Sequence, residues 1–96
     1  MHIMSTQVTI FPNPFLSSLS FEVIVENNAS AIIQMLDQHL KIIKMLSWNL
    51  KKGTNKTSID DLDDLPAGNY YVDIKNMDGK NLFATKIVKI DISASI

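Results

Sequence analysis

Few residues in this sequence are placed to do chemistry. The densest charged group is a set of four aspartates within residues 60–64, whose carboxylates could supply oxygen ligands to Ca²⁺. They lack the alternating spacing and the glycine of a calcium-binding loop, so a solvated connecting loop is the favoured interpretation. His2 and His39 are the two histidines, and neither has a partner spaced for a metal site or a catalytic triad. The sequence therefore predicts no enzyme activity, no metal and no cofactor.

Composition narrows the function classes further. The chain has 96 residues, of which 46% are hydrophobic, enough for one domain with a small core. It contains no cysteine, which excludes disulfides and thiolate metal sites. All nine basic residues are lysines, so the bidentate contacts of arginine are missing and nucleic-acid binding is not expected. No apolar run reaches the roughly 18 residues of a membrane span, and the first five residues do not resemble a signal peptide.

Alternating apolar and polar residues predict strands along most of the chain, most regularly over 19–26. Between 31 and 50 the apolar spacing also fits a helix, but the neighbouring strands and the turn spacing favour a hairpin. Pro12 and Pro14 confine their segment to a sheet edge or to a change of sheet. The predicted strands cover residues 8–10, 19–26, 31–36, 40–48, 57–59, 69–75 and 82–90.

A tight turn precedes one of these strands. Leu65, Pro66, Ala67 and Gly68 form it, because proline fixes its own φ and glycine tolerates a positive φ. The strand then begins near Tyr70. A turn of this kind just ahead of a strand tyrosine is the geometry of a tyrosine corner in Ig-like sandwiches, in which the phenol bonds to backbone a few residues upstream.

Several motifs together resemble one family, the C-terminal sorting domain of the type IX secretion system of Bacteroidetes (Por secretion, type A). The resemblance covers roughly residues 8–90 and rests on the order of the motifs more than on any one of them. The chain departs from the family pattern at Leu40, where the family usually has glycine, and in its extension from Ile90 to Ile96. The matching segments are Phe11-Pro12-Asn13-Pro14-Phe15, Ile33 to Asp37 with Lys41 to Ile43, Gly53 to Asn55, Leu65-Pro66-Ala67-Gly68-Asn69-Tyr70-Tyr71-Val72, Asp78-Gly79-Lys80, and Lys86 to Lys89.

The resemblance implies an all-β fold, an Ig-like or fibronectin-like antiparallel sandwich of about seven strands over residues 7–90. Residues 1–6 would be a disordered start and 91–96 a tail. Such a domain is a non-catalytic label that directs a passenger protein through the periplasm and outer membrane to the cell surface. Its implied partners are the type IX outer-membrane machinery, a sortase-like C-terminal signal peptidase and the passenger. An alternative is an Ig-like or fibronectin-like module that binds protein or carbohydrate.

The resemblance also implies roles for individual residues. Lys86, Ile87, Val88 and Lys89 would be recognised during sorting, whereas the residues themselves allow two solvated lysines on an edge strand. The Pro-Asn-Pro segment, the turn before Tyr70, and Asp78-Gly79 would be scaffold.

The hairpin over 31–48 carries apolar residues on both of its faces. Alternation places Ile33, Met35 and Ile42 on one face. A sandwich buries one face of each sheet, so the other face is expected to contact the passenger or a second copy, forming a homodimer. The residues of this expected partner patch are Ile32, Leu36, Ile43 and Met45.

Overall fold

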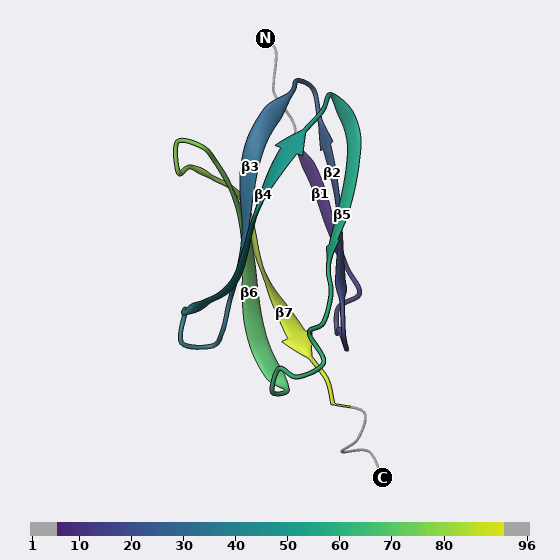
Figure 1. Ribbon diagram of the computed structural model, residues 1–96, viewed down its shortest axis with the longest axis vertical. Helices are drawn as coiled ribbons and strands as arrows, with labels where there is room; N and C mark the ends of the chain where they lie inside the picture. Colours follow the sequence, from purple (N-terminus) through teal and green to yellow (C-terminus); the bar gives the residue numbers. More distant parts are fainter. Residues whose placement is uncertain (1–5, 92–96) are drawn as a thin grey trace.

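The computed structural model describes residues 6–91, which form two antiparallel sheets packed face to face (Figure 1). Most of the expected disordered start and tail, residues 1–5 and 92–96, lies outside this range. The three-stranded sheet has the order β1 (Gln7–Phe11), β2 (Leu19–Val25), β5 (Gly53–Ile59). The four-stranded sheet has the order β4 (Ile42–Leu50), β3 (Ala29–Leu36), β6 (Gly68–Asn76), β7 (Asn81–Lys89).

The predicted fold class, an Ig-like β-sandwich of seven strands, is confirmed. The helical alternative for residues 31–50 is wrong, because β3 buries every second side chain and pairs with β4 and β6. Within residues 6–91 there is no helix at all, and so none long and apolar enough to cross a membrane.

The core lies between the sheets and follows the period of two that the sequence shows. In β2 the alternate residues from Leu19 to Val25 are buried, and in β6 the same holds for Tyr70, Val72 and Ile74. Each aliphatic side chain buried in this way contributes about 1.5–3 kcal/mol relative to exposure. The apolar faces of the two sheets therefore hold them together, and the outer faces are left to solvent or to partners.

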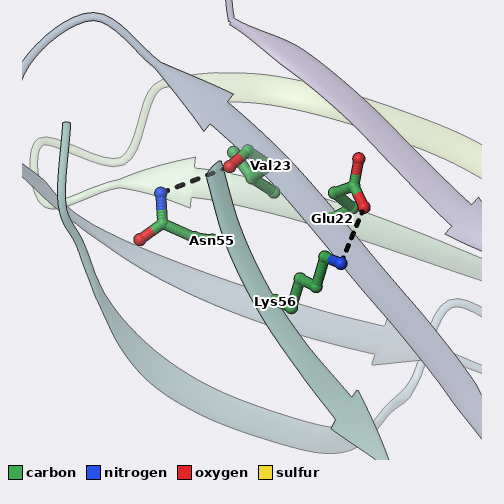
Figure 2. A network of polar contacts seen from close by, with 4 residues as sticks. All are labelled: Glu22, Val23, Asn55 and Lys56. Carbon is green, nitrogen blue, oxygen red and sulfur yellow. Dashed lines mark hydrogen bonds and ion pairs between the residues drawn. The ribbon is translucent and has the colours of Figure 1, made fainter. Parts of the chain in front are cut away.

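Strand β5 begins earlier than expected. The sequence predicted a strand only over 57–59, but β5 starts at Gly53 and pairs with β2 along its whole length. The side chain of Asn55 explains the difference, because its amide donates to the carbonyls of Lys51 (2.8 Å) and Val23 (3.2 Å) and closes the β4–β5 connection. Figure 2 shows Asn55 directed at Val23 of β2. An asparagine that is typical of loops thus serves here to start a strand.

Beside Asn55, an ion pair joins β5 to β2 on the outer face of the three-stranded sheet. The amine of Lys56 lies 3.8 Å from a carboxylate oxygen of Glu22 (Figure 2). The lysine side chain is 73% exposed, so solvent screens the pair and it adds little to stability.

The turn between β3 and β4 and the turn between β6 and β7 have the same hydrogen bonds. In each turn the side-chain oxygen of the first residue, Asp37 or Asn76, accepts the N–H groups two and four residues later, at 2.8–3.0 Å. The fourth residue has a positive φ, which is 84° at Gly79 and 66° at Leu40. Leucine therefore occupies a backbone conformation in one turn that glycine occupies in the other.

The hydrogen bonds of the first turn favour the charged form of the Asp37 carboxyl. The N–H of Lys41 is the main cause that lowers the pKa of this carboxyl below its ordinary value of 3.8. A lowered folded-state pKa means that the contribution to stability is present above the unfolded pKa and is lost as the pH falls through the folded one.

Leu40→Gly is expected to raise the free energy of unfolding by about 0.5–1 kcal/mol, since a left-handed backbone costs a non-glycine residue about 1–2 kcal/mol and the greater freedom of unfolded glycine offsets part of the gain. The Leu40 side chain is 64% exposed, so little burial is lost. Urea unfolding measures the change. Gly79→Ala is the matched control and should destabilise, because a Cβ there has no atom within 4 Å and only the backbone conformation is tested. A less stable Leu40→Gly variant would contradict the strain argument.

A bulge in the β3–β4 hairpin changes which side chains face outward. Met35 pairs with Lys44 but Leu36 pairs with Ile42, which leaves Ile43 as the extra residue. Ile42 consequently lies on the outer face with Leu36, and Ile43 packs against the core. The sequence analysis placed Ile42 on the face of Ile33 and Met35, and Ile43 on the outer face. Both placements are wrong, because one inserted residue reverses the alternation beyond it.

Candidate recognition site at the end of strand β7

The residues expected to be recognised alternate between the core and the outer face. Ile87 lies opposite Tyr70 and is 1% exposed, whereas Lys86 lies opposite Tyr71 on the outer face and is exposed. Val88 is half-buried on the same outer face as Lys86. The folded domain therefore displays Lys86 and part of Val88 and withholds Ile87.

Lys89 differs from Lys86, although the sequence treats the two lysines alike. Lys89 is 5% exposed because it lies on the core-facing side of β7 with Ile87 and beside Phe15. Its amine donates to the carbonyl of Ile90 at 3.1 Å. The interpretation of two solvated lysines is therefore wrong for Lys89, which is part of the packed end of the sandwich.

The segment after β1 crosses from its own sheet to the outer edge of β7. The N–H of Phe15 donates to the carbonyl of Val88 at 2.8 Å, and the N–H of Ile90 donates to the carbonyl of Phe15 at 3.0 Å. The Asn13 side chain continues this pairing, because its oxygen accepts the N–H of Val88 at 3.0 Å and its amide approaches the Lys86 carbonyl at 3.5 Å. The sequence allowed a sheet edge or a change of sheet here, and the segment shows both, because it leaves its own sheet and lies along the edge of β7.

The two prolines of this segment do not interrupt the pairing. Pro12 and Pro14 have no N–H to donate, and they alternate with Asn13 and Phe15, which make the bonds to β7. Asn13 and Phe15 thus suffice to cover the edge of β7 along the last residues of that strand.

Phe15 ties this edge to the tyrosine corner. Its side chain is completely buried, and its ring meets the ring of Tyr70 edge to face at a centroid distance of 6.0 Å. The Tyr70 hydroxyl donates to the carbonyl of Pro66 at 2.6 Å, which confirms the predicted corner. Burial, with the charge of Asp37 as a smaller cause, raises the pKa of Tyr70, so the phenol keeps the proton that it donates.

Three segments that the sequence singled out separately therefore meet at one end of the sandwich: residues 12–15, 65–70 and 86–89. Asp78-Gly79 lies in the β6–β7 turn, at the opposite end of these strands (Figure 1). Sequence reasoning included Phe15 in the motif with the two prolines but did not foresee its burial against Tyr70.

Comparison with known protein families identifies the family to which this chain belongs. A sequence model described as the secretion system C-terminal sorting domain matches residues 9–91. The chain belongs to this family. Its members are non-catalytic sorting signals for type IX secretion, carried by proteins that are secreted to the cell surface or beyond. A search of curated proteins found no match.

Solved structures share the fold of this sorting domain at low sequence identity. Dimeric latent PorU from Porphyromonas gingivalis superposes with a TM-score of 0.70 at 15% identity, over 94% of this chain and 10% of PorU. β-Glucosidases from Listeria innocua (TM-score 0.58, 10% identity) and Kluyveromyces marxianus (0.55, 14%) match over 92% of this chain and 16% and 15% of theirs. The sorting domain thus spans about a tenth of the PorU chain.

The outer face of the four-stranded sheet carries the predicted partner patch of the sorting domain in altered form. Ile32 and Leu36 are half-buried there, and Met45 is 56% exposed. Ile42 takes the place expected for Ile43. One row of paired residues crosses all four strands on this face, in the order Ile42, Leu36, Tyr71, Lys86. The apolar patch of β3 and β4 is therefore continuous with the displayed part of β7.

The four aspartates within residues 60–64 are exposed in the connection between β5 and β6. Leu62, which lies between them, is completely buried, and its N–H donates to the carbonyl of Ser17 at 2.9 Å. Among the residues that the structure describes, no three His, Asp or Glu side chains gather as metal ligands. This connection is an anchored loop with solvated carboxylates.

Proposed function

We propose that this chain is the sorting label of a passenger protein, which it directs through the outer membrane to the cell surface, and that the folded end of β7 is the part recognised. The observation that carries the proposal is the meeting of residues 12–15, 65–70 and 86–89 at that end. The first two segments hold the third in place, so the label is a shaped surface rather than a flexible tail. Its partners would be the outer-membrane machinery, a sortase-like signal peptidase and the passenger.

Burial gives different roles to the four residues 86–89 at the end of β7. Ile87 and Lys89 face inward and position the strand end, whereas Lys86 and Val88 face outward and are available to a receptor. Asn13 and Phe15 occupy the edge of the strand, which leaves the outer face as the accessible side. Recognition of the folded domain would therefore use the outer face of β7.

The test is export of a fusion. The whole chain is attached to the C-terminus of a periplasmically targeted fluorescent protein and expressed in a Bacteroidetes host, with and without a functional type IX system. Fluorescence outside the cell that depends on the system supports the proposal, and retention of a folded fusion in the periplasm would overturn it. Lys86→Glu should lower export while leaving the thermal unfolding midpoint unchanged. Lys56→Glu, at an exposed strand position on the other sheet, is the matched control and should be exported normally.

A further inference from the structure

A shallow hollow of about 470 Å³ lies on the outer face of the four-stranded sheet, beside the displayed end of β7. It is open over Ala84, whose small side chain lies opposite Asp73 in the β6–β7 pairing. The side chains that give the hollow its character are Leu36, Leu40, Tyr71, Asp73, Ala84 and Lys86.

One of these residues carries a cost that the folded domain does not recover. One carboxylate oxygen of Asp73 is buried and has no hydrogen-bond partner among the described residues. A buried acceptor without a donor is destabilising, and native structures contain few of them. A partner that brings a donor to this oxygen would remove the cost.

The charged groups of the hollow are also unpaired. Neither Asp73 nor Lys86 has an ion-pair partner within residues 6–91. An occupant that matches them presents a hydrogen-bond donor to Asp73 and an acidic group to Lys86, with apolar surface between. On the outer face of the other sheet, by contrast, Lys56 and Glu22 pair with each other.

The position of the hollow identifies the kind of partner. Lys86 belongs both to the hollow and to the strand end, whose edge is covered and whose alternate residues are buried. A receptor that reads the outer face of β7 therefore touches the hollow at the same time.

We infer that this hollow docks a polypeptide segment of the outer-membrane secretion machinery, which inserts an apolar side chain beside Leu36 and Tyr71, donates a hydrogen bond to Asp73 and pairs an acidic group with Lys86. The inference rests on the proposed sorting function and names the surface that serves it.

The test uses a substitution that should change stability and recognition in opposite directions. Asp73→Ala removes the unsatisfied oxygen, so it should raise the thermal unfolding midpoint of the isolated chain by several degrees. It should also lower type IX-dependent export of the fluorescent fusion roughly tenfold if it removes about 1.4 kcal/mol of contact. A residue with only a structural role would not show this opposition.

A filling substitution supplies the steric test. Ala84→Trp should block the hollow and abolish export while the domain stays folded. Thr54→Trp is the matched control, because Thr54 is an exposed strand residue on the outer face of the other sheet. Normal export of Asp73→Ala and Ala84→Trp would overturn the docking inference, whereas export of the parent fusion without the type IX system would overturn the proposed function itself.

The same variants distinguish the secretion machinery from two other occupants of the hollow, a second copy of the chain and the passenger. If light scattering finds a dimer of the isolated chain that Ala84→Trp dissociates, the hollow binds a second copy and the inference is wrong. If the export defects appear with one passenger and not with an unrelated one, the hollow binds the passenger and the inference is equally wrong. Defects that persist with both passengers, in a monomeric chain, support the secretion machinery as the partner.

Discussion

Phe15→Ala is expected to lower the free energy of unfolding by about 3–5 kcal/mol, the range found when a fully buried phenylalanine is truncated. Phe15 has no exposed surface, and its ring packs edge to face on Tyr70. A loss of this size is a large part of the 5–15 kcal/mol or so that stabilises a typical domain. Urea unfolding measures it, at low temperature if the variant is marginal.

Phe11→Ala is the matched control for this substitution. Phe11 lies four residues earlier and is 47% exposed, so the same change in chemistry should cost far less. Because Phe15 holds the edge of β7, its truncation should also speed hydrogen exchange at the amides of Val88 and Ile90 more than elsewhere in the sheet. Equal losses in the two variants, or unchanged exchange at the end of β7, would show that Phe15 does not anchor the strand.

Ile43→Lys is expected to destabilise the domain by about 2–3 kcal/mol, near the upper end of ordinary point mutations, because it drives a charge into a partly buried apolar contact. The bulge between Met35 and Leu36 turns Ile43 toward the core and Ile42 toward the outer face. Ile42→Lys is the matched control and should change stability by no more than about 0.5 kcal/mol, since Ile42 is 44% exposed. Chemical unfolding of both variants under the same conditions makes the comparison.

The pair of variants tests the register of the hairpin as well as its energetics. If Ile42→Lys is the more destabilising of the two, the hairpin pairs without the bulge and the outer patch contains Ile43 after all. A regular hairpin would also change the row that joins Ile42 to Lys86, and with it the surface next to the hollow.

A label of this design is read through its folded shape. The Pro-Asn-Pro segment and the tyrosine corner contact β7 and one another, and little of either needs to touch a receptor. Asn13 uses its side chain in place of a backbone strand, which satisfies the edge of β7 with few residues. Substitutions in these scaffold segments are therefore expected to affect sorting by way of stability, and substitutions on the outer face of β7 to affect it directly.

The sequence by itself determined the class of fold, the number of strands, the tyrosine corner and the lack of any group of residues spaced for catalysis. These depend on local signals. Alternation reports which side of a strand is buried, and proline, glycine and asparagine restrict or permit particular backbone conformations at turns.

Only the tertiary structure decided the early start of β5, the exchange of Ile42 and Ile43, the separate fates of Lys86 and Lys89, and the hollow. Each of these depends on a partner distant in the chain. A bulge is a difference in length between two strands, and neither strand shows it alone. The burial of Lys89 depends on Phe15, a residue distant in the sequence that the fold brings beside the end of β7.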